Sequence, residues 1–308
     1  MKSSICIGTR GSALALWQAN HVKDCIENVF PDIRVDIEII KTTGDRITDR
    51  PLAMVGGKGL FVKEIETALL EGRIDLAVHS MKDMPGDLPQ GLVIGAIPER
   101  ANPFDVLISA RGDLFKEYPR GAVIGTSSLR RGSQLKHLRP DLEIKSIRGN
   151  LDTRLKKLKS GEYSAIVLAA AGLERLGQGN EITEYLSETD MVPAVGQGAL
   201  CIETRENDPD MADILSVLDH EPTRVCVTGE RAFLKEIEGS CHIPVACFGK
   251  IQDNRVMLTA VVAAEDGGSL IKETVESSPE QVTEKGRELA KLVLDKGGKR
   301  ILEALNIP

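Results

Sequence analysis

The stretch that decides the fold is ICIGTRGS, residues 5–12. Its first four residues form a short apolar run typical of a buried β-strand, and its last four are small or polar residues typical of a turn. A helical pattern follows from about Ser12 to Val29, with Ser12 placed as the N-cap. A strand that leads through a polar turn into a helix is the basic unit of an α/β fold.

The same alternation recurs over the first two-thirds of the chain. Helical spacing covers Phe61 to Leu70, and helical segments also follow Ser128, Asn150 and Ala170. Because strands separated by helices usually pair in parallel, we predict mostly parallel sheets flanked by helices. The further predicted strands are residues 35–40, 76–78, 93–95, 106–108, 122–125, 144–147 and 165–168.

The C-terminal part of the chain has a different pattern, with strand-like runs in series. A final helix is expected to begin with Ser278 as N-cap and Pro279 in its first position, and to reach about Leu305. We therefore predict a third domain with a small three-stranded antiparallel sheet and helices. The strand-like runs are residues 245–249, 256–264 and 269–275, and the turn-like segments between them are 252–255 and 265–268.

Two boundaries divide the predicted α/β part, near residues 98–103 and 191–193. Two β/α lobes joined by two crossings would leave a crevice between them, which is a common place for small ligands. The expected domains are lobe 1 at residues 1–98 with 194–218, lobe 2 at residues 99–193, and a C-terminal domain at residues 219–308.

Composition argues against several classes of protein. The 308 residues are 42% hydrophobic and 28% charged, as in ordinary globular proteins. An aromatic share of 3% and a net charge of -7 argue against a nucleic-acid binder. No window approaches the roughly 18 apolar residues of a membrane helix, and the first apolar run is too short for a signal peptide. Because the cysteines lack paired spacing and the histidines lack metal-ligand spacing, we expect a cytoplasmic protein with reduced thiols and no structural metal.

Polar and cationic side chains gather where the predicted strands end. In open α/β sheets, ligands bind beyond the carboxyl ends of strands, near helix N-termini. Hydroxyl and backbone N–H groups there can bind carboxylates or phosphates, and Arg can grip one with two parallel hydrogen bonds. Recurrence predicts a ligand with many negative charges, although each Ser or Thr can also be a plain helix cap and each Arg a solvated charge. The segments are residues 9–12, 80–83, 126–131 and 148–150, with Arg154 and Arg175 expected on the first turns of later helices.

Three further features have both a functional and a structural interpretation. The glycine-rich loop 56–61 lacks the order of a P-loop; it is either a surface loop or a lid in which Lys58 meets an anionic substrate and Phe61 screens it from water. Asp83 is either a cap or ion-pair partner, or a carboxylate that stabilises a developing cation and moves a proton. Cys241, in a turn-forming stretch, is either an inert thiol or a nucleophile.

Taken together, segments across nearly the whole chain resemble the porphobilinogen deaminase family, in that family's order. The resemblance implies two lobes like periplasmic binding proteins and a third domain that carries the cofactor. The matching segments are residues 9–15, 55–61, 77–83, 125–131, 148–150, 193–198 and 238–241.

The resemblance also implies an activity and its residues. A dipyrromethane cofactor would be held by a thioether to Cys241, and four porphobilinogen molecules would be joined to it, each losing ammonia, before water releases hydroxymethylbilane. Asp83 maps to the catalytic acid. The positions implied for cofactor binding are Lys82, Asp83, Thr126, Ser128, Arg130, Arg131 and Arg148, and those for substrate binding are Arg10, Ser12, Lys58, Phe61, Arg154, Arg175 and Gln197. The family is also expected to be monomeric.

Two departures from the family and two rival functions remain. Met54 stands where many members have a lysine, and His242 follows the cysteine where Gln is frequent. A non-catalytic anion-binding protein would share the paired lobes, and a thiol-dependent hydrolase would need a histidine base near Cys241. His242 is poorly placed to be that base, because it is the immediate neighbour of Cys241 in a turn.

Overall fold

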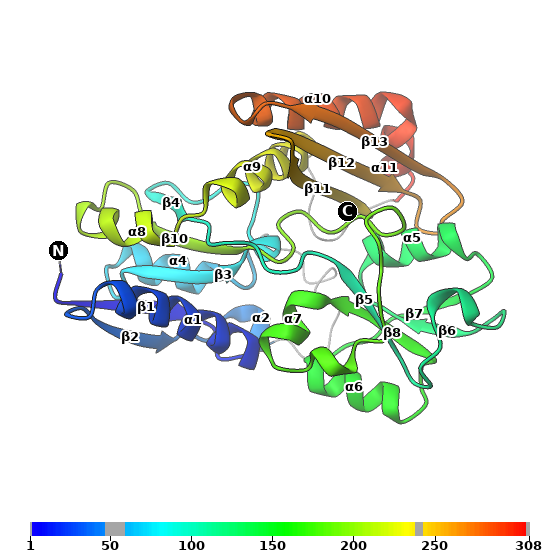
Figure 1. The fold of residues 1–308 in the computed structure, drawn as a ribbon, viewed down its shortest axis with the longest axis horizontal. Coiled ribbons are helices and arrows are strands. Elements are labelled where there is room, and N and C mark those ends of the chain that lie inside the picture. Colours follow the sequence, from blue (N-terminus) through cyan, green and yellow to red (C-terminus); the bar gives the residue numbers. More distant parts are fainter. Residues whose placement is uncertain (1, 47–58, 238–242, 306–308) are drawn as a thin grey trace. The chain divides into compact units, whose positions relative to one another are not determined.

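The structure is a computed structural model that describes residues 2–46, 59–237 and 243–305 (Figure 1). The chain divides into two compact units: unit 1 contains residues 1–101 and 199–224, and unit 2 contains residues 102–198 and 225–308. The chain therefore leaves unit 1 and later returns to it. The three-domain boundaries drawn from the sequence stay a prediction.

Unit 1 is built on a five-stranded sheet with the order β2-β1-β3-β10-β4. β1 pairs in parallel with both β2 and β3, as predicted, whereas β10 pairs antiparallel with β3 and β4. The sequence analysis did not anticipate β10, which enters the sheet only after the chain returns from unit 2. The strands are β1 (Ser4–Thr9), β2 (Arg34–Ile39), β3 (Leu76–Ser80), β4 (Leu92–Ala96) and β10 (Leu200–Arg205).

Helices cover both faces of this sheet because its strands alternate buried side chains between them. On one face, Leu76 and Val78 join a core with α1 and α8; on the other, Ala77 joins a core with α4. α1 has 17 residues, and no helix in the described ranges is long and apolar enough to span a membrane. The helices are α1 (Ala13–Val29), α2 (Thr43–Arg46), α4 (Lys63–Leu70), α8 (Ala212–Leu218) and α9 (Glu221–Glu236), which runs on into unit 2.

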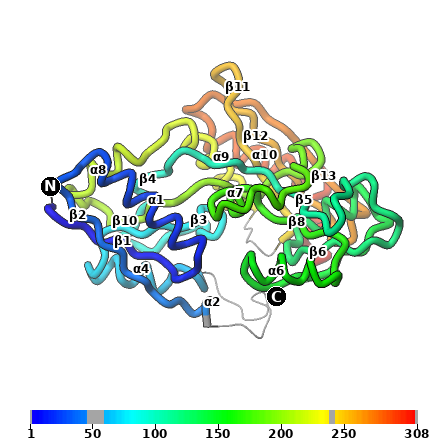
Figure 2. The backbone as a smooth tube through the Cα atoms, turned by 60° about the horizontal axis from the view of Figure 1, so that its bottom comes forward, coloured from blue at the N-terminus to red at the C-terminus, as the bar shows by residue number. Residues whose placement is uncertain are grey.

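Unit 2 repeats this sheet plan with the order β7-β6-β8-β5-β9. Three of these strands, β5, β6 and β8, are labelled in Figure 2. β6 pairs in parallel with β7 and β8, and β5 is the antiparallel strand. In each sheet, four strands therefore run in the same direction and one, β10 or β5, runs the opposite way. The elements are β5 (Asp105–Ser109), β6 (Val123–Gly125), β7 (Glu143–Lys145), β8 (Ala165–Ala169), β9 (Glu184–Tyr185), α5 (Leu129–Leu138), α6 (Leu151–Lys159) and α7 (Ala170–Arg175).

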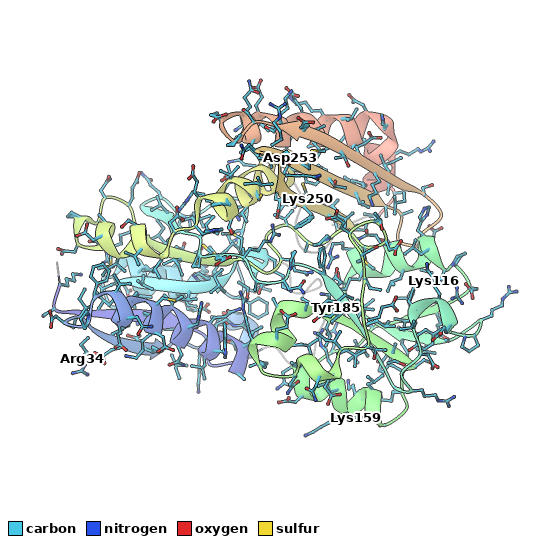
Figure 3. The ribbon with its side chains drawn as sticks, viewed as in Figure 1. Arg34, Lys116, Lys159, Tyr185, Lys250 and Asp253 are labelled. Atoms are coloured by element: carbon cyan, nitrogen blue, oxygen red, sulfur yellow. The ribbon has the colours of Figure 1, made fainter. Side chains whose placement is uncertain are left out.

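The C-terminal strands form the predicted antiparallel sheet, β11-β12-β13, with α10 packed along it (Figure 1). The turn between β11 and β12 places Asp253 (labelled in Figure 3) and Asn254 at φ 49 and 60, the left-handed conformation that tight hairpins require. The prediction of one continuous last helix was wrong, because Gly297, at φ 117, breaks it. The elements are β11 (Val245–Gln252), β12 (Arg255–Ala263), β13 (Leu270–Ser277), α10 (Val282–Val293) and α11 (Lys299–Glu303).

Candidate functional site: cationic strand ends

In unit 1, the carboxyl ends of β1 and β3 lie at the same edge of the sheet, because the two strands are parallel neighbours. β1 leads into Arg10 and Ser12, and β3 leads into a single 3₁₀ turn, Met81–Asp83. The sequence prediction that these residues follow strand ends is confirmed. Ser12 is also the predicted N-cap of α1, with its Oγ accepting from Ala15 N at 3.3 Å.

Arg10 lies between an acid and an aromatic ring. Its guanidinium donates to both oxygens of Asp45, with Nε at 3.1 and 3.3 Å, and its Cζ is 4.1 Å from the centroid of the Phe61 ring. Burial would raise the pKa of the Asp45 carboxyl, but hydrogen bonds from Arg10 and Thr42 hold it below its usual range. Arg10 and Phe61 are thus brought together, whereas the acid that balances Arg10 was not foreseen.

Met81, the first residue of the turn that carries Lys82 and Asp83, fixes this turn to the sheet of unit 1. The Met81 side chain is 1% exposed, and its N–H donates to the carbonyl of Ala199 at 3.0 Å, which extends the pairing of β3 with β10. Met84 N closes the turn on Met81 O at 3.1 Å. Lys82 is half-buried and Asp83 is exposed. A fixed backbone therefore presents an accessible carboxylate, which is the geometry that a general acid needs.

In unit 2, β6, β7 and β8 are parallel and also end at one edge. The hydroxyl groups after β6 support the turn: Thr126 Oγ1 accepts from Ser128 N at 3.2 Å, and Ser128 Oγ caps α5 by accepting from Arg131 N at 3.4 Å. Arg148, after β7, is exposed. The structure therefore supports the interpretation of Ser128 as a helix cap. The main cationic groups at this edge of the sheet are the arginines.

Arg130 and Arg131, at the start of α5, converge on Asp105, the first residue of β5. Arg130 binds Asp105 through Nη1 at 2.6 Å and Nη2 at 3.1 Å, and Arg131 donates from Nε at 2.8 Å. Asp105 is 0% exposed and the two arginines are 5% and 7% exposed. Burial would raise the pKa of Asp105, but the two guanidinium groups hold it well below its usual range. Neither arginine is the solvated surface charge that the sequence left open.

Gln197 completes this network from the segment that leads back to unit 1. Its Nε2 donates to Asp105 at 3.0 Å and to the Pro103 carbonyl at 2.7 Å. The preceding residue, Gly196, donates its N–H to the buried Glu230 of α9 at 2.7 Å. Asp105 and Glu230 were both missed by sequence reasoning, and Gln197 is one of the residues predicted to contact the substrate.

Arg154 and Arg175 add half-buried cations to unit 2. Burial and the nearby Arg131 lower the pKa of Arg154, and burial lowers the pKa of Arg175 to about 10, against the opposing charge of Glu174. Arg154 Nε donates to the Gly149 carbonyl and Arg175 Nη2 to the Gly198 carbonyl, both at 2.8 Å. The prediction that Arg175 lies on a first turn was wrong: it is the last residue of the short helix α7.

Four residues singled out from the sequence, Lys58, Cys241, Met54 and His242, lie outside the described residues. Every other predicted site residue is described. The remaining five cysteines are reduced, and Cys201, Cys226 and Cys247 are buried.

Comparison with known proteins identifies the family. Residues 5–213 match the model described as porphobilinogen deaminase, dipyromethane cofactor binding domain, and residues 224–295 match the porphobilinogen deaminase C-terminal domain. The porphobilinogen deaminase of Syntrophobacter fumaroxidans is 49% identical over 98% of this chain and 97% of its own length; that of Nitratidesulfovibrio vulgaris is 52% identical over 97% and 96%.

Solved structures resemble the chain more distantly. A TRAP periplasmic solute binding protein from Desulfovibrio salexigens aligns with a TM-score of 0.44 and 11% identity, over 71% of this chain and 73% of its own. A substrate binding domain of a putative amino acid ABC transporter from Streptococcus pneumoniae aligns with a TM-score of 0.45 and 12% identity, over 70% and 92%.

The chain belongs to the porphobilinogen deaminase family, the enzymes named hydroxymethylbilane synthase, and its larger matched region is the family's dipyrromethane cofactor binding domain. The predicted family, its tetrapyrrole-forming activity and its cofactor are confirmed, as is the α/β fold with its C-terminal antiparallel sheet.

The side chains of unit 2 fit such a cofactor, which carries several carboxylates. Arg130 is close enough to lower the pKa of Arg131, and Arg131 is close enough to lower the pKa of Arg154. Asp105 is the one carboxylate that the described hydrogen bonds give these arginines. Desolvated guanidinium groups in excess of carboxylates are unfavourable unless an anion joins them. A dipyrromethane side chain would supply that charge.

Proposed function

We propose that this chain joins four porphobilinogen molecules head to tail, with loss of ammonia, on a dipyrromethane primer bound to Cys241, and releases hydroxymethylbilane. The observation that carries the proposal is the buried arginine network around Asp105, which has positive charge to spare for carboxylates. Full-length similarity to the family supports it.

Each group has a role that follows from its surroundings. Arg130 and Arg131, fixed by Asp105, would bind cofactor carboxylates, with Lys82, Thr126, Ser128 and Arg148 contributing further donors. Arg10, Ser12, Lys58, Phe61, Arg154, Arg175 and Gln197 would bind the carboxylates of incoming substrate. The cofactor supplies the nucleophilic pyrrole carbon to which the first substrate is joined.

Asp83 would act on the substrate amine. Held at the end of the 3₁₀ turn, its protonated carboxyl group would donate a proton to the departing amine, and the carboxylate that results would stabilise the positive charge that develops on the pyrrole. Its exposure leaves the carboxylate accessible to substrate. The arginines bind and orient, and Asp83 moves the proton.

Intact mass measurement tests the function directly. Purified wild type is expected to carry a covalent excess equal to two linked pyrrole units, and Cys241→Ser is expected to lack it, because only a thiolate forms the thioether. Cys25→Ser is the matched control and should keep the excess, since Cys25 is a partly exposed thiol on α1. An unmodified wild-type mass would favour a non-catalytic anion-binding protein, and an adduct retained by Cys241→Ser would move the attachment elsewhere.

The setting of the enzyme is also part of the proposal. A cytoplasmic, monomeric enzyme that acts on a small molecule and binds no nucleic acid agrees with the acidic net charge of -7. Sedimentation of the purified protein would test the monomer.

A further inference from the structure

Three titratable side chains are buried on the face of the unit 1 sheet that α4 covers. They are Glu66 on α4, His79 on β3 and Glu203 on β10, with exposures of 7%, 5% and 0%. Their surroundings are apolar, because the core on this face contains Ile65 and Leu69 of α4. Buried ionisable groups are costly unless they satisfy one another, so these three must be considered as a unit.

Two of the three are joined directly. His79 Nε2 lies 3.0 Å from Glu203 Oε2. The strand register pairs Ala77 with Glu203 and His79 with Cys201, so His79 and Glu203 are diagonal neighbours on one face. This contact links β3 and β10 immediately before β3 ends.

One oxygen of each glutamate lacks a donor. Glu66 Oε1 and Glu203 Oε1 are buried, and neither has a hydrogen-bond partner among the described residues. Two acceptors cannot satisfy each other, but a protonated carboxyl donates to a neighbouring carboxylate. One proton on Glu66 would therefore satisfy both oxygens.

The charges around Glu66 favour that proton. Burial and the charge of Glu203 together raise the pKa of Glu66 to about 7, although His79 and Lys63 oppose the shift. The other strands packed against α4 contribute few titratable groups: β1 contributes the Cys6 thiol, and β4 has no titratable side chain.

The cation that β10 contributes, Arg205, is engaged at the C-terminal end of α4. Arg205, on β10, donates to the carbonyls of Leu69 and Ile74 at 3.0 and 2.7 Å. Within the described residues, Glu66 is therefore the group on this face suited to hold a proton.

We propose that Glu66 donates a hydrogen bond from its protonated carboxyl to Glu203, and that Glu66, Glu203 and His79 together are positioning residues for the turn that carries Lys82 and Asp83. His79 is four residues from Asp83, and the same strand pair continues from His79 through Ser80 to the contact of Met81 N with Ala199 O. Loss of the proton would leave two repelling charges, on Glu66 and Glu203, buried against the paired strands β3 and β10, and would loosen the turn. The positioning role rests on the proposed function of Asp83, whereas the presence of the proton on Glu66 is independent of that function.

The sign of the pH dependence follows from the raised pKa. Glu66 contributes stability that is fully present below its ordinary pKa of 4.5 and is lost as pH rises through about 7. Each pH unit above the folded-state pKa lowers the protonated fraction about tenfold. Turnover should fall over the same alkaline range if the turn depends on the cluster.

Glu66→Gln tests the proton without using activity. The amide is neutral at every pH and keeps a donor for Glu203, so the fold should survive. The wild-type Tm is expected to fall between about pH 5 and about pH 8, and Glu66→Gln should lose this component. Glu71→Gln is the matched control, since Glu71 is an exposed carboxylate at the end of the same helix and should keep the wild-type slope. Equal slopes in wild type and Glu66→Gln would overturn the shared proton.

The pH profile of kcat then tests positioning. We expect kcat of Glu66→Gln to hold to higher pH than that of wild type, with KM unchanged. An altered Tm slope with an unaltered kcat profile would overturn the positioning role. Failure of the proposed function is a separate result, because wild type would then fail to convert porphobilinogen while its Tm slope remained.

Discussion

Asp83→Asn is expected to keep the covalent adduct on the protein and to lower kcat by about a hundredfold or more. Asn has the shape of Asp but can neither deliver a proton nor offset a developing positive charge. The turn should persist, because it is held by the buried Met81 and by the bond from Met81 N to Ala199 O, not by the exposed Asp83. Steady-state turnover of porphobilinogen measures the loss, and intact mass measures the adduct.

The matched control for this substitution is Asp36→Asn. Asp36 is an exposed aspartate on the edge strand β2, where it pairs with Arg34. The Asp36→Asn substitution removes the same charge from the same unit and should leave kcat unchanged. Near-normal turnover of Asp83→Asn would remove Asp83 from its catalytic role, and loss of the adduct would make its contribution one of cofactor assembly.

Most regular elements could be predicted because their side chains alternate with the period of a strand or a helix. β10 could not, since Glu203 and Thr204 interrupt its apolar run although both are buried. Their burial depends on partners in β3 and α4 that are distant in sequence. Arg175 was misplaced because α7 has six residues, too few for its end to show in a periodic pattern.

The predicted strand-end residues illustrate what a sequence can and cannot locate. Parallel strands end at one edge, so Arg130 and Arg131 could be placed there from the pattern alone. Asp105 lies at the amino end of its strand, and the sequence gives no reason to look there. β5 runs antiparallel, however, and its register pairs Asp105 with Ala169, the last residue of β8. A strand of opposite direction thus brings its first residue to the edge where the others end.

Asp105→Asn is expected to lower the free energy of unfolding by about 3–5 kcal/mol, because it leaves Arg130 and Arg131 buried without their counter-charge. Cofactor loading should become incomplete, since the two guanidinium groups would no longer be oriented. Urea unfolding measures the first effect and the fraction of protein with the adduct mass measures the second. Asp141→Asn is the control: Asp141 pairs with Arg139 in the same unit but is partly exposed, so its loss should leave the free energy of unfolding nearly unchanged.

The pH dependence of Asp105 has the opposite sign to that of Glu66. A depressed pKa means stability that is present above the ordinary value of 3.8 and is lost as pH falls through the lower folded-state pKa. Wild type should therefore lose this contribution progressively as pH falls below 3.8, and Asp105→Asn should lack this loss of stability in acid. Adding Arg131→Met to Asp105→Asn removes one of the uncompensated charges and should recover part of the lost stability, whereas additive losses would show that the pair is not coupled. Recovery of stability without recovery of the adduct would separate the two roles of Arg131, as a buried charge within the fold and as a donor to the cofactor.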